Sequence, residues 1–284
     1  MPTFKQLIHQ YTEKCAELDL PDQTALTYLV ELTQKNRVDL YMNYDEEVPE
    51  KVKEEYELGM TRILNHEPMQ HVLGYSWFYG YQFVVNANVL IPRPETEELV
   101  SHILAHIDEH FPKGEIICAD IGTGSGAIAI SVAKEEARVK MFATDISEEA
   151  IEIAKLNALN NEAKVEFMTG DMLQPLIDKG IKLDVLISNP PYIPQQEVLE
   201  ESVIDFEPHV ALFGGEDGLK FYRAILENCN KVLNEKAFMA FEMGWDQKET
   251  LTNEVKKYLP DSKVEVIKDI NGKDRMLFVL IEPK

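Results

Sequence analysis

The sequence is short of positive charge, of cysteine and of long apolar runs. Its 284 residues include 28 Lys and Arg against 50 Asp and Glu, a formal net charge of −22. Because sequence-independent binding to a phosphate backbone draws most of its energy from Lys and Arg, we expect no stable binding to nucleic acid. Cys15, Cys118 and Cys229 lie far apart, which argues against a disulfide framework or a cysteine zinc site and predicts reduced, mostly buried thiols.

No apolar run reaches the length of a membrane span, and residues 1–11 lack the continuous apolar core of a signal peptide. We therefore expect a cytoplasmic chain with no membrane attachment. Its length and ordinary apolar content suit one sizeable α/β domain and a smaller one.

Two patterns precede the larger domain. Apolar residues spaced by three and four, with breaks at Pro21 and Pro49, predict a small helical bundle over residues 1–72. Glycines and aromatic residues with period-two stretches then predict a β-hairpin linker over residues 73–92. The remaining residues, 93–284, form the predicted larger domain.

In residues 93–284, predicted strands alternate with predicted helices, which is typical of an α/β fold with a doubly wound, mostly parallel sheet. Asn271-Gly272 favours a tight turn, so the last two strands are expected to pair antiparallel. The predicted strands are Ile116–Ile121, Lys140–Asp145, Val165–Thr169, Leu183–Ser188, Ala237–Met243, Val264–Lys268 and Arg275–Ile281.

The stretch Asn189-Pro190-Pro191-Tyr192 directly follows a predicted strand, where open α/β sheets bind their ligands. Two prolines stiffen the loop and remove two backbone donors. A planar amine fits this arrangement, since it can donate one N–H to the Asn189 side-chain oxygen and another to the Pro190 carbonyl. Tyr192 offers an aromatic face for packing.

A glycine-rich turn follows the first predicted strand and opens a helix. It reads Gly122-Thr123-Gly124-Ser125-Gly126, and glycines there let a ligand approach the backbone closely. The helix amino terminus favours a carboxylate or phosphate. Asp145 ends the next predicted strand, at the distance where an acid usually binds ribose hydroxyls. Together these features indicate a nucleoside-type cofactor.

With these motifs the chain resembles the class I methyltransferases that use S-adenosylmethionine. Within them it is similar to the peptide chain release factor glutamine methyltransferases, the HemK/PrmC family. That closer resemblance covers nearly the whole chain and rests on three further segments: Gln70-His71-Val72-Leu73-Gly74, Val89-Leu90-Ile91-Pro92-Arg93-Pro94-Glu95-Thr96-Glu97 and Gly214-Gly215-Glu216-Asp217-Gly218-Leu219. It implies a seven-stranded, Rossmann-like methyltransferase sheet.

The resemblance implies S-adenosyl-L-methionine as cofactor and S-adenosyl-L-homocysteine as product. It implies that Asp145 holds the ribose and that Asp171 and Met172 lie on the adenine side. It also implies that Asn189 borders both cofactor and substrate. The glycine-rich turn would border the methionine part of the cofactor, through Gly122, Thr123, Gly124, Ser125 and Gly126.

The implied substrate is the glutamine of the Gly-Gly-Gln loop in bacterial class I release factors, methylated on its side-chain amide nitrogen. The amino-terminal helices would dock the bulk of that protein, and the enzyme is expected to be a monomer. The implied catalytic residues are Asn189, Pro190 and Tyr192. Pro191, Arg93 and Glu95 would complete the substrate-binding wall.

Three other functions stay open from the residues alone. Methylation of the exocyclic amine of adenine or guanine needs the same Asn-Pro-Pro-Tyr geometry, although charge argues against it. A nicotinamide-dependent oxidoreductase shares the glycine loop but needs a proton donor that is not evident. A catalytically silent binding protein that only retains the cofactor fold is the third, but such a protein would not need to keep Asp145, Asn189 and Tyr192.

Two polar patterns are interpreted as solvated surface. His102, His106 and His110 recur every four residues on one predicted helix, but without a paired acid or cysteine ligand we expect no metal there. The acidic run 197–201 is expected on an exposed helix face. Because it follows the Asn-Pro-Pro-Tyr loop, it is also a candidate border of the substrate entrance.

Overall fold

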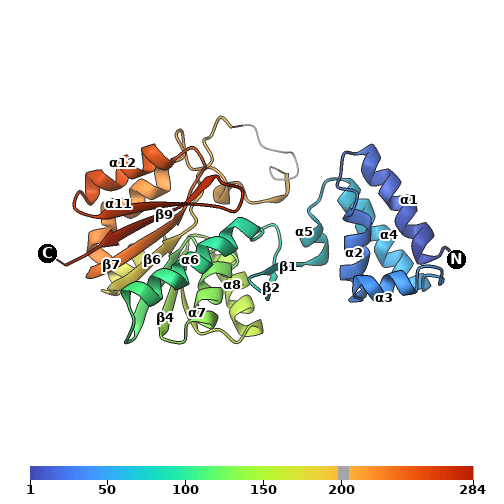
Figure 1. Cartoon of the computed structure of the whole chain (residues 1–284), viewed down its shortest axis with the longest axis horizontal. Coiled ribbons are helices and arrows are strands. Elements are labelled where there is room, and N and C mark those ends of the chain that lie inside the picture. The colour runs from blue at the N-terminus through green and yellow to red at the C-terminus, as the bar shows by residue number, and fades with distance from the viewer. Residues whose placement is uncertain (198–204, 284) are drawn as a thin grey trace. The chain divides into compact units, whose positions relative to one another are not determined.

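The computed structural model describes residues 1–197 and 205–283. These residues form two compact units, which are considered separately (Figure 1). The first unit comprises residues 1–74 together with 205 and 206. The second comprises residues 75–197 and 207–283. The acidic run predicted over 197–201 lies outside the described residues except for Glu197, which is exposed.

The first unit is a helical bundle, drawn in blue in Figure 1. Its first helix begins with a capping box, in which Thr3 and Gln6 satisfy each other's backbone N–H groups. Tyr56 lies at the centre of the core, stacked on Tyr28 at 5.5 Å and edge-on to Tyr11 at 5.3 Å. The helices are α1 (Phe4–Glu17), α2 (Thr24–Thr33), α3 (Arg37–Met42), α4 (Glu50–Leu64) and α5 (Met69–Leu73).

The second unit is built on a seven-stranded sheet of order β5-β4-β3-β6-β7-β9-β8. Neighbours from β5 to β7 pair parallel, whereas β9 pairs antiparallel with both β7 and β8. The strands are β3 (Ile116–Ile121), β4 (Val139–Asp145), β5 (Val165–Thr169), β6 (Leu183–Ser188), β7 (Leu233–Glu242), β8 (Lys263–Lys268) and β9 (Asp274–Ile281). The predicted fold class is confirmed, including the terminal antiparallel pair.

Helices cover both faces of this sheet, with α6, α7 and α8 on one side and α11 and α12 on the other (Figure 1). Successive strand residues point to opposite faces, so Cys118 of β3 joins the first core cluster and Ala119 the second. The helices are α6 (Pro94–His110), α7 (Ala127–Glu135), α8 (Glu148–Asn160), α9 (Gln174–Asp178), α11 (Lys220–Val232) and α12 (Lys248–Tyr258), with a 3₁₀ turn η1 (His209–Ala211).

A two-stranded hairpin of β1 (Tyr75–Phe78) and β2 (Tyr81–Val84) precedes α6. Phe78 and Phe83 bury its inner side in the same core cluster as α6 and α7. The Asn157 side chain of α8 accepts from the Val84 N–H at 2.7 Å and donates to the Val84 carbonyl at 3.0 Å. The hairpin is therefore fixed to α8 by hydrogen bonds as well as by apolar packing.

The histidines of α6 do not form the solvated face that their spacing predicts. His106 is buried, and its ring stacks on Phe278 of β9 with ring centroids 4.1 Å apart. His110 is stacked on His106 at 5.9 Å. The prediction of a solvated face was wrong because imidazole carries an apolar ring face that packs well on aromatic residues. Across residues 1–197 and 205–283, no group of three or more His, Cys, Asp or Glu is placed to hold a metal ion.

The three cysteines are free and buried, as their spacing predicts. The strand β7 is longer than expected, since it begins at Leu233 and not at Ala237. None of the helices in the described ranges has the length and apolar content that crossing a membrane requires.

Candidate active site

The loop between β3 and α7 is shaped by its glycines. The Gly122 N–H donates to the Thr144 carbonyl of β4 at 2.8 Å, which turns the chain across the end of the neighbouring strand. Gly122, Gly124 and Gly126 have φ of +73°, +54° and +82°, a region that favours glycine. A Cβ on Gly126 would lie only 2.9 Å from Ile130 Cδ1. The path of the loop therefore depends on glycine at these positions.

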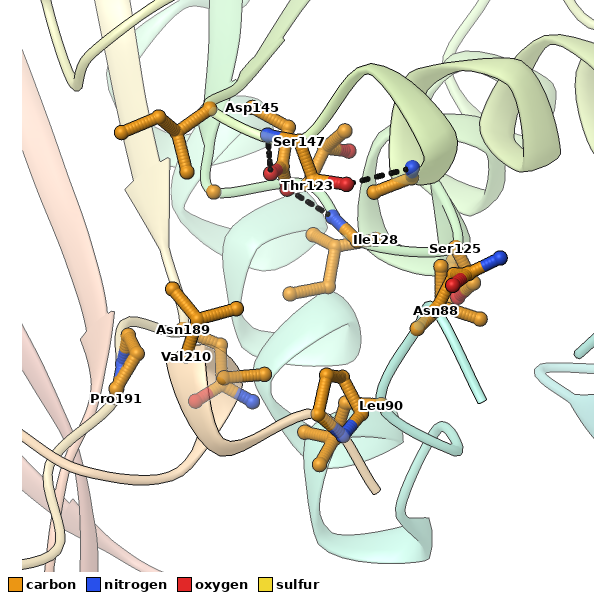
Figure 2. A pocket seen from close by; sticks show the side chains of 18 of the residues that line it. Asn88, Leu90, Thr123, Ser125, Ile128, Asp145, Ser147, Asn189, Pro191 and Val210 are labelled. Atoms are coloured by element: carbon orange, nitrogen blue, oxygen red, sulfur yellow. Dashed lines mark hydrogen bonds between the residues drawn. The ribbon is translucent and has the colours of Figure 1, made fainter. Parts of the chain in front are cut away.

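Asp145 ends β4 and holds this loop from the side (Figure 2). Its Oδ2 accepts from the Gly124 N–H at 2.8 Å, and its Oδ1 accepts from the Ser147 N–H at 3.0 Å. Each carboxylate oxygen can accept a second hydrogen bond. Asp145 is thus fixed in orientation and still able to accept from a pair of ligand hydroxyls.

Asp120, the penultimate residue of β3, is buried behind the loop. The Thr123 hydroxyl donates to its Oδ2 at 2.6 Å, whereas its Oδ1 has no hydrogen-bond partner among the described residues. Burial raises the pKa of Asp120 to about 7, and the nearby charge of Asp145 adds to the effect. An unsatisfied buried acceptor at this loop fits a site that a polar ligand completes.

The Asn-Pro-Pro-Tyr loop leaves the sheet at the end of β6, next to β3. The Ser188 hydroxyl donates to the Ile121 carbonyl at 2.7 Å and so ties the ends of the two strands together. The Asn189 Nδ2 donates to Thr96 Oγ1 at 3.4 Å. Pro190 is buried, and the Tyr192 hydroxyl is directed at Glu242 Oε1 at 3.5 Å. The side chain of Asn189 is thereby oriented by α6.

Two glycines of the late Gly-Gly-Glu-Asp-Gly segment pack against the backbone of this loop. A Cβ on Gly214 would lie 2.5 Å from the Pro191 carbonyl oxygen, and one on Gly218 would lie 2.3 Å from that of Tyr192. The Gln247 Nε2 donates to the same Tyr192 carbonyl at 3.1 Å. The late segment therefore serves as the support of the Asn-Pro-Pro-Tyr loop.

Arg93 joins two segments of the second unit that border the site. Its guanidinium pairs with the buried carboxylate of Glu207, whose Oε2 also accepts from the Ile91 N–H at 3.4 Å. The segments on either side of this ion pair contribute Leu90 and Val210 to one cavity (Figure 2). Arg93 therefore lies in the wall of the cavity with its charge already matched by an acid.

The cavity encloses about 980 Å³, including its open mouth, and lies within the second unit. Figure 2 shows Asp145 and Ser147 at one end and Asn189 and Pro191 at the other. The predicted site residues that line it are Arg93, Gly122, Thr123, Gly124, Ser125, Asp145, Met172, Asn189 and Pro191. The structure thus brings the predicted cofactor and acceptor residues to one space.

Five residues of the predicted site lie outside this lining: Glu95, Gly126, Asp171, Pro190 and Tyr192. Gly126 shapes the turn into α7 from behind. Asp171 is exposed at the end of β5, and Glu95 lies in the first turn of α6.

Several residues that support the site were missed in the sequence. Asn157 of α8 is fully buried and donates to the Ser125 carbonyl at 2.9 Å, which fixes the glycine loop from below. Glu207 anchors Arg93, Thr96 lines the cavity beside Asn189, and Glu242 lies behind Thr96. The sequence does contain a signal for Glu242, because it is the single acid inside the otherwise apolar predicted strand Ala237–Met243.

A seven-stranded sheet of this order, with a glycine turn after β3, an acid ending β4 and Asn-Pro-Pro-Tyr after β6, defines an S-adenosylmethionine-dependent methyltransferase. The family model described as Methyltransferase small domain matches residues 96–206, and the one described as PrmC N-terminal domain matches residues 6–74. The chain belongs to the release factor glutamine methyltransferase family, as its relatives show.

The release factor glutamine methyltransferase of Bacillus cereus is 45% identical to this chain, over 89% of this chain and 90% of its own length. That of Bacillus subtilis is 46% identical over 75% of each chain. Among solved structures, a methyltransferase from Pyrococcus furiosus superposes with a TM-score of 0.52 at 21% identity, over 78% of this chain and 97% of its own. This last likeness shows the fold alone.

Proposed function

We propose that this chain transfers the methyl group of S-adenosyl-L-methionine to the side-chain amide nitrogen of the glutamine in the Gly-Gly-Gln motif of bacterial class I release factors. The observation that carries the proposal is the position of Asn189. It lies on the wall of the same cavity as the glycine loop and Asp145. S-adenosyl-L-homocysteine is the second product.

We assign the cofactor end of the cavity to Asp145, which would accept from the ribose hydroxyls, and to Met172, whose thioether would pack on the adenine. When bound, S-adenosylmethionine supplies a methyl group already activated by its sulfonium, so positioning is the main task of the protein. The remaining residues assigned to cofactor binding are Gly122, Thr123, Gly124, Ser125, Gly126, Asp171 and Asn189.

The acceptor end is assigned to Asn189 and Pro190, whose side-chain and backbone oxygens would accept the two N–H groups of a carboxamide. An amide nitrogen is a poor nucleophile because its lone pair is delocalised into the carbonyl. Hydrogen bonds to both protons draw electron density onto the nitrogen and hold it in line for attack. The released proton passes to solvent, and no general base is needed.

The remaining acceptor residues are assigned to shape the wall. Pro191 and Arg93 line the cavity directly, and Arg93 is held by Glu207. Tyr192 and Glu95 are assigned a less direct part, since the Tyr192 hydroxyl is directed at Glu242 and Glu95 lies in the first turn of α6.

The domain assignment follows the predicted boundaries. Residues 1–72 are proposed to dock the release factor, 73–92 to link, and 93–284 to carry the chemistry. With a net charge of −22 the chain is proposed to act on a protein and not to bind nucleic acid stably. We further propose a monomer that acts in the cytoplasm, without membrane attachment.

Methylation of an exocyclic amine of adenine or guanine is the second candidate. The observation that favours it is again Asn189, because a planar nucleobase amine can donate to the same side-chain oxygen. Its weakness is charge, since a nucleic-acid enzyme needs basic residues along its binding surface.

The test is to incubate the purified chain with S-adenosylmethionine and an unmodified class I release factor, then to map methylation by mass spectrometry of the Gly-Gly-Gln peptide. One added methyl group on that glutamine is expected. A release factor carrying Ala in place of that glutamine serves as the control and should gain none. Methylation of DNA or RNA in parallel reactions, with the release factor unmodified, would overturn the proposal in favour of the second candidate.

A further inference from the structure

A buried acid lies behind the acceptor end of the site. Glu242, the last residue of β7, is only 3% exposed and is not in the lining of the cavity. The hydroxyl of Thr96, itself buried in the first turn of α6, donates to Glu242 Oε2 at 2.6 Å. Thr96 in turn lies next to Asn189, whose Nδ2 is 3.4 Å from Thr96 Oγ1. The three side chains form a row from the core to the cavity wall.

The acid determines which group donates and which accepts in each hydrogen bond of this row. The Thr96 hydroxyl donates its one proton to Glu242, as it must whenever Glu242 is ionised, because an ionised carboxylate can only accept hydrogen bonds. The Thr96 oxygen is then left as an acceptor for the Asn189 amino group. Once the amino group of Asn189 is turned to Thr96, its carbonyl oxygen is the group left free to accept. A buried carboxylate therefore sets which end of the Asn189 amide a ligand can meet.

The remaining contacts hold Glu242 itself in place. The Tyr192 hydroxyl donates to its Oε1 at 3.5 Å, and the Tyr222 hydroxyl donates to its backbone carbonyl at 2.6 Å. The positive charge of Arg275 on β9 acts on the same carboxylate, although Arg275 is itself bonded to Asp269 at 3.3 Å. Glu242 is thus held on several sides and not free to turn.

Resting on the proposed function, we propose that Glu242 is a positioning residue which acts on Asn189, partly through Thr96, to turn the Asn189 side-chain oxygen toward the acceptor amide. The acid does not touch the substrate. Its role is to select one of the two amide orientations, which differ little in shape but are opposite in hydrogen-bonding character. An Asn189 turned the other way would present N–H groups to the N–H groups of the acceptor.

The mechanism predicts a pH dependence. Burial raises the pKa of Glu242, and Glu95 adds to the rise, while Thr96, Arg275 and Asn189 oppose it. A protonated Glu242 can donate to Thr96, which then can donate to the Asn189 oxygen and release the fixed orientation. The rate of methyl transfer should therefore fall as pH is lowered through the raised pKa of Glu242.

The closing experiment compares Glu242→Gln, Thr96→Val and Thr96→Ser with the wild-type chain. Gln and Val are close in shape to Glu and Thr, but they no longer fix the direction of the hydrogen bonds that lead from Glu242 through Thr96 to Asn189. Ser keeps the hydroxyl of Thr96. We expect Glu242→Gln and Thr96→Val to lower kcat by about 10- to 100-fold with cofactor Kd within about twofold. Thr96→Ser should stay near wild type, and Glu242→Gln should lose the acid limb of the kcat profile.

A readout independent of turnover separates this proposal from the proposed function. The Asn189 side-chain NH₂ signals, assigned by comparison with Asn189→Ala, are followed by ¹⁵N NMR in the presence of S-adenosylhomocysteine. They should be sharp in the wild-type chain and in Thr96→Ser, and shifted or broadened in Thr96→Val and Glu242→Gln. Unchanged Asn189 signals in both Thr96→Val and Glu242→Gln, or wild-type kcat in both, would overturn the positioning role of Glu242. This holds whichever substrate the chain methylates.

Discussion

The two ends of the cavity are built in different ways. The cofactor end comes from short continuous stretches, chiefly the glycine turn and the residues around Asp145, and most of its hydrogen bonds are made by the backbone. The acceptor end offers the Asn189 side chain, which is oriented by residues from α6 and β7 that lie far away in sequence. The cofactor end therefore distributes its hydrogen bonds over many backbone groups, whereas the acceptor end depends on the orientation of one side chain, Asn189, beside the Pro190 carbonyl.

This difference has a consequence for function. Variants of the cofactor end should weaken binding of S-adenosylmethionine. They should slow transfer much less, because backbone donors remain to position the cofactor that does bind. Variants of the acceptor end should slow transfer with only a small change in that affinity, because Asn189 would meet the acceptor nitrogen in the transition state.

The largest effect is expected for Asn189→Ala. Loss of an oriented hydrogen-bonding group at a reacting centre costs about 10²- to 10³-fold in kcat, and the cofactor Kd should change by less than about threefold. Single-turnover methyl transfer and calorimetric titration with S-adenosylhomocysteine measure the two quantities. Asn160→Ala, at the exposed end of α8, is the matched control and should leave both unchanged. Near-normal turnover of Asn189→Ala would refute its assigned role.

Asp145→Asn should act on affinity instead. Both carboxylate oxygens accept from backbone N–H groups, so the amide nitrogen of Asn must face a donor on one side. We expect the cofactor Kd to rise about 10- to 100-fold, with kcat at saturating cofactor much less affected. Titration of Glu152→Gln, which removes one exposed charge from α8, controls for the change in net charge. An unchanged Kd for Asp145→Asn would show that the ribose is held elsewhere.

Gly126→Ala tests the glycine turn through stability. The added Cβ meets Ile130 at 2.9 Å and Ala154 Cβ at 3.2 Å, at a φ of +82°. A loss of about 1–3 kcal/mol in unfolding free energy is expected from denaturant titration. Gly180→Ala has a φ of +64° but nothing within 4 Å of the new Cβ, so it should cost only about 1 kcal/mol. Equal losses in the two variants would mean that crowding at Gly126 contributes nothing.

The smallest effect is expected for Met172→Ala. Met172 lines the cavity through a thioether side chain, and its loss should raise the cofactor Kd by only about three- to tenfold. Met172→Leu, which preserves most of the volume, should bind like the wild-type chain. A drop in kcat with unchanged Kd would place Met172 at the acceptor end and contradict the division between the two ends.

The parts of the fold and site that the sequence predicts are those with local patterns. Strands such as Leu183–Ser188 are apolar runs ended by turn residues, and the glycine turn is read directly from its letters. Where the structure departs from the prediction, the cause is a contact with a residue far away in sequence. His106 was expected in solvent because nothing near it in sequence reveals Phe278, on which it stacks.

The supports of the site were hidden for the same reason. Glu242 and Thr96 are 146 residues apart, and Glu207 is 114 residues from Arg93. No periodicity or short motif can pair such residues, because their contact is created only when the sheet and α6 are assembled. Asn189 and Arg93 can therefore be recognised in the sequence, whereas the contacts that hold them cannot.

We propose above all that the Asn189 side-chain oxygen receives the acceptor amide. A crystal structure of the chain with S-adenosylhomocysteine and a Gly-Gly-Gln peptide tests it by the distance from the glutamine Nε2 to Asn189 Oδ1. We expect a hydrogen bond of roughly 3 Å, with the Asn189 Nδ2 still directed to Thr96. A glutamine bound elsewhere in the cavity, or an Asn189 turned away from the glutamine amide, would contradict this role of Asn189.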